Sequence, residues 1–388
     1  MFFPLPSWPV LYLYTGATAF VLAAFAMPGA IALLRRFNIL DRVSGEKLHR
    51  HPTPRGGGIV IFIAFAIAVL VPDYRDNPMK GVLMGSFICL VVGALDDLRG
   101  GVPATIKLIA LTWATLVMSL FGVQINLTGL FLVDLFLTWL WIVGVTSAFN
   151  GIDNMDGLAS GVAVIVSSMY VTIAIDAHFE AGTETSLSWF GLLAAGLVGS
   201  NLGFLLYNFK PAKVFMGDSG SFFLGFTLAA LGVMGECAHS SVVACTIPAL
   251  ILAVPIFDFA YILIARILQG QTRTVRDVIE HCAQDHLSHR LVWLGFSQRR
   301  AVLFIYLMAF VLGLAGIMLR NSTRGFDSAI GLIQGLSVAA LIVTLMLTAG
   351  SRQASLERRM GAMIRLPRAA PGAGEANAES SEEMRKSA

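Results

Sequence analysis

The sequence predicts an all-α membrane protein with about eleven transmembrane helices, its N-terminus outside and its C-terminus in the cytoplasm. Of the 388 residues, 56% are hydrophobic and only 13% are charged, whereas a soluble domain has roughly 25% charged residues. Apolar segments long enough to cross a bilayer recur along the chain. Basic residues gather in alternate connections between these segments. The composition therefore excludes a soluble fold.

Each predicted helix is an apolar segment close to the ~20 residues that span a bilayer. The eleven segments are 9–34, 57–72, 79–95, 105–121, 129–149, 157–176, 187–206, 219–235, 240–268, 300–320 and 328–349. They predict one membrane domain over residues 1–349, followed by a disordered cytoplasmic tail, 350–388, rich in Ala, Gly, Glu, Ser and Arg. The first segment is expected to be retained as an anchor, because Arg35 and Arg36 follow it and no basic residue precedes it.

Lysine and arginine determine the predicted orientation. The connections after odd-numbered helices, together with the tail, hold 23 of the 27 lysines and arginines. Such residues accumulate in cytoplasmic loops, so these connections are predicted to be cytoplasmic.

Five polar segments lie on this predicted cytoplasmic face; they span residues 41–58, 93–101, 150–161, 209–223 and 281–290. The first, "DRVSGEKLHRHPTPRGGG", carries positive charge suited to phosphate at Lys47, His49 and Arg55. Its prolines stiffen an extended path, and its glycines let the backbone approach a ligand or a neighbour closely. A positive-inside loop that leads into a helix also explains these residues.

The second segment, "GALDDLRGG", places the carboxylates of Asp96 and Asp97 side by side at the end of an apolar helix. Their repulsion would be relieved by a shared divalent cation, and Mg²⁺ prefers oxygen ligands. A hydrated helix end is the alternative. Lys107 follows one turn into the next helix, where it is either a snorkelling anchor or a phosphate ligand.

The third segment, "NGIDNMDGLASG", spaces Asn150, Asp153 and Asp156 three residues apart. A helical turn would bring them to one face. The segment has no lysine or arginine, so a polar ligand or a cation is the expected partner. An acidic region that caps the next helix is the alternative.

The last two segments combine helix starts with groups that bind phosphate. In "FKPAKVFMGDSGSFF", Asp218 precedes an apolar run and is either a helix cap or a ligand, while Phe215 can stack on a flat ring. In "HCAQDHLSHR", His286, His289 and Arg290 favour phosphate recognition over a zinc site or a solvated basic loop.

Carboxylates for a metal and basic groups for phosphate on one face predict chemistry on a phosphorylated substrate at the cytoplasmic membrane surface. The chain has neither the G-x-x-x-x-G-K-[ST] pattern of a P-loop ATPase nor the G-x-S-x-G elbow of a serine hydrolase. No nucleic-acid partner is expected.

The five segments, in this order, resemble the hallmarks of the polyprenyl-phosphate N-acetylhexosamine-1-phosphate transferases of glycosyltransferase family 4. The motifs "KLHRHPTPRGGG", "LDDL", "NGIDNMDGLA", "NFKPAKVFMGDSGS" and "HLSHRL" carry the resemblance, which covers residues 35–300. It implies transfer of a sugar-1-phosphate, in the closest branch GlcNAc-1-phosphate, from a UDP-sugar to undecaprenyl phosphate with release of UMP. Such a reaction starts a cell-surface polysaccharide (O-antigen, common-antigen or teichoic-acid linkage type) at the bacterial inner membrane, with a cytoplasmic active site.

The resemblance also implies roles for individual residues. Asp96, Asp97 and Asp218 would be catalytic and would hold Mg²⁺, with Mn²⁺ as the alternative. The nucleotide-binding residues would be Asn150, Asp153, Asp156 and Phe215. The residues that bind phosphate or sugar would be Lys47, His49, Arg55, Lys107, His286, His289 and Arg290.

Four residues depart from the family pattern. Gly100 replaces a frequent third acid, and Val43 and Glu46 replace a common Pro and Arg. Ser288 stands at the third place of a motif that often reads H-[IL]-H-H, which leaves the histidine roles open.

Two other functions remain alternatives. A phospho-N-acetylmuramoyl-pentapeptide transferase belongs to the same superfamily but usually carries T-P-T-M-G-G and a triple histidine, which this chain lacks. An ion-coupled transporter is favoured by Asp134 and Asp258 within apolar segments, the latter after Pro255 and therefore expected on a kink that faces the bundle. Gly199 and Gly203 form a G-x-x-x-G motif that fits either a homodimer or internal packing.

Overall fold

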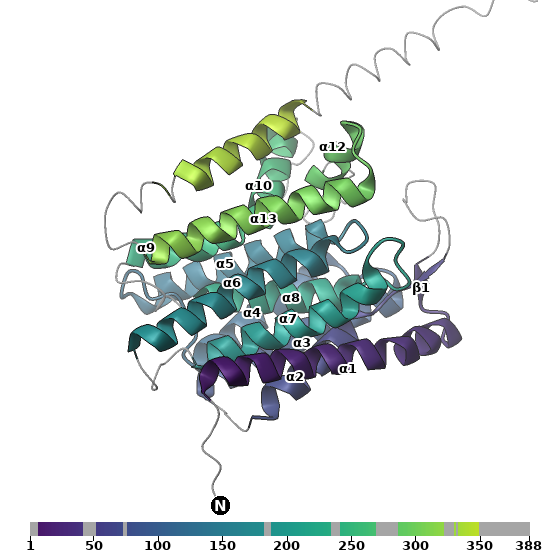
Figure 1. Ribbon diagram of the computed structural model, residues 1–388, viewed down its shortest axis with the longest axis horizontal. Helices are drawn as coiled ribbons and strands as arrows, with labels where there is room; N and C mark the ends of the chain where they lie inside the picture. Colours follow the sequence, from purple (N-terminus) through teal and green to yellow (C-terminus); the bar gives the residue numbers. More distant parts are fainter. Residues whose placement is uncertain are drawn as a thin grey trace, which may run out of the picture.

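The computed structural model describes residues 7–41, 52–72, 76–181, 188–233, 241–268, 286–321, 330 and 333–348. Within this part the chain is a bundle of helices that lie alongside one another, with α1 at one edge and α13 and the last helix at the opposite edge (Figure 1). The predicted tail, 350–388, and Lys47 and His49 of the predicted site fall outside the described residues.

A helix occupies each of the eleven ranges in which the apolar pattern predicts one. The elements are α1 (Trp8–Arg36), β1 (Leu40–Asp41), β2 (Thr53–Pro54), α2 (Gly58–Leu70), α3 (Asn77–Arg99), α4 (Ala104–Leu120), α5 (Phe131–Ile152), α6 (Leu158–Ala181), α7 (Ser188–Asn208), α8 (Gly217–Val233), α9 (Ser241–Ile251), α10 (Ala253–Leu268), α12 (Leu287–Trp293), α13 (Gln298–Arg320) and a final helix, Ile333–Thr348.

Six of the described helices, α1, α3, α5, α6, α7 and α13, are long and apolar enough to cross a membrane. The pair α9 and α10 makes a seventh candidate, although it bends by 83°. The segment predicted over 240–268 is therefore bent, and its break at Leu252 lies three residues before the Pro255 after which the sequence predicts a kink. Pro255 explains the restart, because it lies in the first turn of α10, where its missing N–H leaves no hydrogen bond unmade. The chain is thus a multi-pass membrane protein, and the full count of eleven spans stays a prediction.

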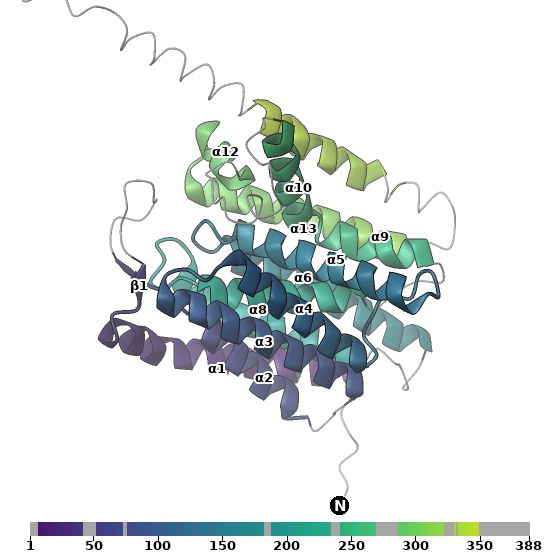
Figure 2. The same cartoon turned by 180° about the vertical axis from the view of Figure 1, so that it is seen from behind.

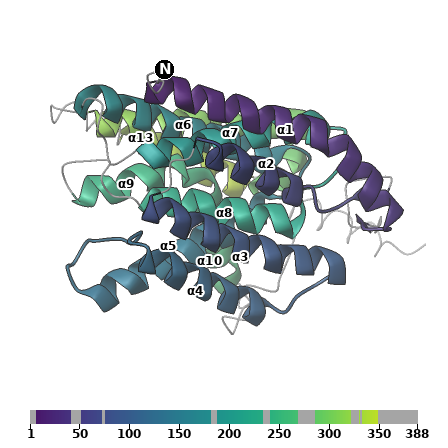
Figure 3. The same cartoon turned by 90° about the horizontal axis from the view of Figure 1, so that it is seen from below.

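Helix α8 is the core of the bundle. Figure 3 shows it between α3, α4 and α5 on one side and α1, α6 and α7 on the other. Almost every residue of α8 is buried, including the small polar residues of its first turn. A helix that is apolar on all sides is buried either in a protein core or in lipid, and here protein surrounds α8. The N-terminus of α8 is consequently held in a defined place, which matters for Asp218.

The G-x-x-x-G motif serves packing inside the chain. A Cβ atom at Gly199 would lie 1.9 Å from the carbonyl oxygen of Gly16, and one at Gly203 would lie 2.7 Å from that of Phe20. These two glycines of α7 therefore let α1 approach at backbone distance. Internal packing is the correct one of the two interpretations, and the predicted homodimer draws no support from this motif.

A short two-stranded sheet brings the first polar segment to the fourth. β1 pairs with β2 in antiparallel fashion, and the chain beyond β2 runs beside the residues that precede α8. The amide of Phe215 donates to Pro54 O at 2.8 Å, Gly57 N donates to Phe215 O at 3.0 Å, and Gly58 N donates to Met216 O at 3.0 Å. Figure 2 shows β1 at the same end of the bundle as α12.

Candidate active site

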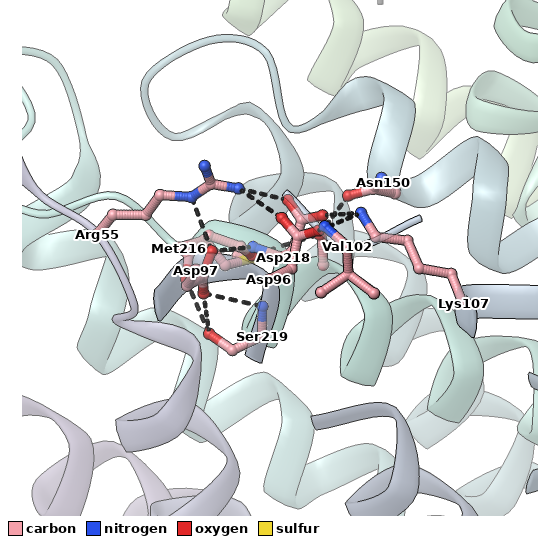
Figure 4. A network of polar contacts seen from close by, with 11 residues as sticks. Arg55, Asp96, Asp97, Val102, Lys107, Asn150, Met216, Asp218 and Ser219 are labelled. Atoms are coloured by element: carbon pink, nitrogen blue, oxygen red, sulfur yellow. Dashed lines mark hydrogen bonds and ion pairs between the residues drawn. The ribbon is translucent and has the colours of Figure 1, made fainter. Parts of the chain in front are cut away.

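Three aspartates from two helices form a carboxylate cluster at this end. Asp96 and Asp97 belong to the last turn of α3, and Asp218 belongs to the first turn of α8 (Figure 4). One carboxylate oxygen of each lies within 4.8 Å of the others. The structure therefore brings together the three residues that the sequence predicts as a metal site, although Asp218 is 121 positions from Asp97.

The close approach of α3 to α8 depends on Gly93. A Cβ atom at this position would lie 2.2 Å from the carbonyl oxygen of Asp218 and 2.6 Å from the Cα atom of Ser219. Both contacts are with backbone, which cannot move aside as a flexible side chain would. Only glycine permits the geometry that places Asp96 and Asp97 beside the start of α8.

Asp97 caps α8 from the neighbouring helix. Its Oδ1 accepts from Asp218 N at 2.9 Å, and its Oδ2 accepts from Ser219 N at 3.1 Å and from Ser219 Oγ at 2.7 Å. A carboxylate at this place satisfies backbone donors that have no partner within the helix and complements the positive end of the helix dipole. The sequence left Asp218 as either a helix cap or a ligand, and in the structure Asp97 of α3 provides the cap.

Arg55 and Lys107 balance the three carboxylates. Arg55 Nε lies 2.7 Å from Asp97 Oδ1, and its NH2 atom lies 2.6 Å from Asp218 Oδ1. Lys107 Nζ lies 2.9 Å from Asp96 Oδ1 and 2.5 Å from Asp218 Oδ2. Burial would lower the pKa of Arg55, but the three carboxylates raise it above its ordinary value, so the guanidinium is charged. Lys107 is thus a member of the site as well as a residue near the membrane surface.

Asp96 and Asp218 differ from Asp97 in their partners. Both oxygens of Asp97 are engaged by the start of α8. Asp96 Oδ1 accepts a hydrogen bond from Val102 N at 2.7 Å. The ion-pair partners of Asp96, like those of Asp218, are the long side chains of Arg55 and Lys107. A metal or a phosphate can therefore change the partners of Asp96 and Asp218 without undoing the helix cap.

The third segment does not form the predicted helical face. Helix α5 ends at Ile152, and residues 153–157 form a turn before α6 begins. The prediction fails because Asn and Asp side chains compete for backbone hydrogen bonds, as where Asn154 Nδ2 donates to Gly151 O at 2.8 Å. Asn150 Oδ1 instead accepts from Ser221 Oγ at 2.6 Å, and Asp156 Oδ2 accepts from Ala212 N at 3.1 Å. Asn150 and Asp156 of the third polar segment are therefore both bonded to residues of the fourth polar segment.

The carboxylate of Asp153 is close enough to the aspartate cluster to feel the charge of Asp218. Burial, and after it the Asp218 carboxylate, raises the pKa of Asp153 to about 7. Its charge therefore changes near neutral pH, unlike that of an ordinary aspartate. Such a side chain can donate a hydrogen bond to a polar ligand when it is protonated and can only accept one when it is ionised.

The fifth segment contacts the third through α12. Ser288 Oγ donates to Asn154 Oδ1 at 2.6 Å, so the serine that departs from the family pattern has a defined partner. Arg290 NH1 donates to Met346 O at 2.8 Å, and its guanidinium lies 5.1 Å from the centre of the Tyr261 ring. These contacts attach α12 to α10 and to the last helix. His289 also lies in α12.

The two acids that favoured a transporter have local partners. Asp134, in the first turn of α5, accepts from Thr128 N at 2.9 Å and from Gly129 N at 3.1 Å. Asp258, in α10, accepts from His286 Nδ1 at 2.8 Å and from Leu287 N at 2.7 Å. Asp258 is only 2% exposed, which confirms that it faces the bundle. The transporter alternative therefore loses the residues that supported it, and Asp258 becomes a neighbour of the predicted site that sequence reasoning missed.

Comparison with known proteins defines the class and then the family. The model of glycosyl transferase family 4 matches residues 79–236, which include all three clustered aspartates. The chain is 38% identical, over 74% of its length and 79% of the relative's, to a probable undecaprenyl-phosphate N-acetylglucosaminyl 1-phosphate transferase of Bacillus subtilis. It belongs to glycosyl transferase family 4.

Two further relatives show the breadth of this similarity. A decaprenyl-phosphate N-acetylglucosaminephosphotransferase of Mycolicibacterium smegmatis is 29% identical over 85% of this chain and 87% of its own. A phospho-N-acetylmuramoyl-pentapeptide-transferase of Streptococcus pyogenes is 33% identical, but over a smaller part, 58% of this chain and 72% of its own.

Proposed function

We propose that the protein transfers GlcNAc-1-phosphate from UDP-GlcNAc to undecaprenyl phosphate and releases UMP, as the first membrane step of a cell-surface polysaccharide. The observation that carries the proposal is the cluster of Asp96, Asp97 and Asp218 balanced by Arg55 and Lys107, in a chain 38% identical to an enzyme named for the corresponding transfer. The similarity to that relative extends over more of the chain than the similarity to the pentapeptide transferase.

The donor set of the cluster fits Mg²⁺, with Mn²⁺ as the alternative. Mg²⁺ favours a few carboxylate oxygens together with substrate phosphates, and three carboxylate oxygens lie within 4.8 Å of one another here. Asp96 and Asp218 would hold the ion, with Asp97 beside them. When bound, the ion withdraws charge from the diphosphate and stabilises UMP as the leaving group.

Arg55 and Lys107 exchange their partners in this proposal. Without a cation they neutralise Asp96 and Asp218. With a divalent cation held by these oxygens, Arg55 and Lys107 would no longer be needed to neutralise the carboxylates, and their guanidinium and ammonium groups would be available to bind phosphates. Charge-assisted hydrogen bonds from Arg and Lys to phosphate oxygens are strong and directional, so both side chains are suited to hold the diphosphate and the attacking phosphate.

In the transfer, an oxygen of undecaprenyl phosphate attacks the β-phosphorus of the donor. A new P–O bond forms, and the bond between the β-phosphorus and the oxygen that stays with UMP breaks. A phosphate monoester is largely ionised near pH 7, so any remaining proton passes to a carboxylate. Asp96 suits this role better than Asp97, because both oxygens of Asp97 already accept hydrogen bonds from the start of α8.

The remaining predicted residues would surround the donor. Phe215 and the turn residues Asn150, Asp153 and Asp156 would lie around the uridine. His286, His289 and Arg290, together with Lys47 and His49, would bind the diphosphate or the sugar. The contacts of Arg290 with Met346 and Tyr261 indicate that it acts through the position of α12.

The proposal includes the placement in the membrane. We infer eleven spans, an outside N-terminus and a cytoplasmic site in the bacterial inner membrane. The orientation is supported by the 23 of 27 lysines and arginines that fall in the connections predicted to be cytoplasmic. UDP-sugars are made in the cytoplasm, so the donor would reach the cluster from that side.

Release of UMP by the purified full-length protein tests the function. The reaction would contain Mg²⁺, undecaprenyl phosphate and one of a panel of UDP-sugars; we expect release with UDP-GlcNAc and none after addition of EDTA. Asp218→Asn is expected to abolish turnover while the protein still inserts into the membrane. Release only with UDP-N-acetylmuramoyl-pentapeptide would favour the alternative transferase, and no release with any donor would overturn the proposal.

The same assay separates a direct transfer from a two-step path through a phosphorylated aspartate. In a direct transfer, labelled donor leaves no label on the protein when undecaprenyl phosphate is absent. A labelled sugar-phosphate trapped on the enzyme would show the two-step path.

A further inference from the structure

We propose that Asp258 is a positioning residue for the donor substrate. It holds the imidazole of His286 so that Nε2 remains available to the donor beside the donor-binding segment 150–157. The proposal rests on the function proposed above and adds a residue that the family motifs do not contain. Asp258 lies in α10, outside the five polar segments, and among the described residues it contacts the predicted site residue His286.

The hydrogen bonds of Asp258 determine the tautomer of His286. Asp258 Oδ2 lies 2.8 Å from His286 Nδ1, and Asp258 Oδ1 accepts from Leu287 N at 2.7 Å. An ionised carboxylate only accepts hydrogen bonds, so Nδ1 carries a proton and donates it. In the neutral ring, Nε2 is then the acceptor that remains for a ligand. Since both residues are buried, the pair has little freedom to change this arrangement.

The His286 ring lies against the end of α5, directly before the turn that would bind the nucleotide. A Cβ atom at Gly151 would be 3.0 Å from His286 Cε1, so the ring packs on the backbone between Asn150 and Asp153. Ser288 Oγ, two residues further on, donates to Asn154 Oδ1 at 2.6 Å. These two contacts place His286 and Ser288 against the segment 150–157, which holds three predicted donor ligands.

A purely structural role is the alternative, because Asp258 also caps the short helix α12 through Leu287 N. Asp258→Asn separates the two roles. The amide oxygen of asparagine can still accept from Leu287 N, so the cap is retained. The amide nitrogen then meets Nδ1 as a donor, which makes Nδ1 the acceptor and moves the proton to Nε2. A reversed tautomer of this kind leaves the geometry intact and impairs only what the histidine does.

The test measures UMP release by the full-length protein while each substrate is varied in turn. Asp258→Asn is expected to raise the KM for UDP-GlcNAc about tenfold or more, with the KM for undecaprenyl phosphate within about twofold of the wild type. His286→Ala should have a similar effect, and the double variant should be no worse than His286→Ala, because a residue that acts through His286 has nothing left to position.

Asp134→Asn is the matched control. Asp134 is equally buried, at 2% exposure, and it also accepts from backbone N–H groups beside a helix. Its substitution is expected to leave both KM values unchanged.

Two results would overturn the positioning role. One is a lower melting temperature of Asp258→Asn with an unchanged KM for UDP-GlcNAc, which would show that the residue only caps α12. The other is additive loss in the double variant, which would show that Asp258 does not act through His286. An inactive wild type with every UDP-sugar would overturn the proposed function as well, whereas an active wild type with either of these results overturns the positioning role alone.

Discussion

Lys107 shows at the residue scale how one side chain can serve two states of a site. It contacts Asp96 and Asp218 at 2.9 and 2.5 Å and lies 5.1 Å from the centre of the Phe222 ring. Its ammonium group therefore competes with any cation for the same carboxylate oxygens. The sequence left a snorkelling anchor and a phosphate ligand open for this residue, and its ion pairs favour the second.

Lys107→Met is expected to lower turnover about 100-fold, because a charged donor to phosphate is lost at the reacting centre. In the absence of substrates the same variant should bind Mn²⁺ more tightly than the wild type, since no ammonium competes for Asp96 and Asp218. Electron paramagnetic resonance of free Mn²⁺ measures this affinity. Lys80→Met, which removes an exposed lysine bound to Asn77, is the control, and unchanged Mn²⁺ affinity in Lys107→Met would contradict the exchange of partners.

Asp153 predicts a pH dependence with a definite sign. Burial and the Asp218 carboxylate raise its pKa to about 7 in the folded protein, whereas it is about 3.9 in an unfolded chain. Between these values the folded state binds the additional proton, so the contribution of Asp153 to stability falls as the pH rises from about 4 to about 7. Above pH 7 its charge opposes folding in full.

Asp153→Asn should remove this dependence. In EDTA-treated detergent solution, its melting temperature is expected to exceed that of the wild type by a few degrees at pH 8 and to approach it at lower pH. The KM for UDP-GlcNAc of the wild type should also change across pH 6–8, and that of the variant should not. Equal melting curves for the two proteins at pH 8 would contradict the burial of an ionised Asp153.

At the scale of elements, the site depends on how closely α3 approaches α8. Uniform apolar runs predict where these helices begin and end, because their lengths must match the bilayer. Nothing in those runs predicts that Asp97 of α3 caps α8, because the cap joins residues 121 and 122 positions apart. The turn at 153–157 was also missed, since Asn and Asp at three-residue spacing fit a helix and a turn equally well.

Gly93→Ala tests the approach of these two elements. The added methyl group would meet the carbonyl oxygen of Asp218 at 2.2 Å, and overpacking of this kind destabilises by typically ~1–3 kcal/mol or more. We expect a lower melting temperature and loss of UMP release, because α8 and Asp218 must shift. Gly144→Ala, in α5, is the control, because its Cβ atom would meet nothing within 4 Å. A fully active Gly93→Ala protein would show that the approach of α3 to α8 is not required.

At the scale of the whole molecule, the described parts of the polar segments lie at one end of the bundle, and the long apolar helices form its length (Figures 1 and 2). A carboxylate cluster balanced by Arg and Lys can therefore meet a water-soluble donor and a lipid-bound phosphate at the membrane surface. The predicted orientation puts this end in the cytoplasm.

Cysteine labelling tests the orientation. In a background without the four native cysteines, Arg99→Cys lies at the site end of α3, and Asn126→Cys lies in the connection between α4 and α5. A membrane-impermeant maleimide should label Asn126→Cys in intact cells and Arg99→Cys only in inverted vesicles. The reverse pattern would place the site outside and refute the predicted topology.

The sequence by itself determined that the fold lies in a membrane, where its helices occur and which residue types form the site. Apolar length and local motifs are properties of the chain alone. The family resemblance of those motifs then named Asp96, Asp97 and Asp218 as a set. Only the tertiary structure decided which partners these residues have. The cap that Asp97 provides for α8, the balance of charge by Arg55 and Lys107 and the bond between Asp258 and His286 all join distant segments. Such contacts arise when a bundle packs around α8, and no local pattern of residues encodes them.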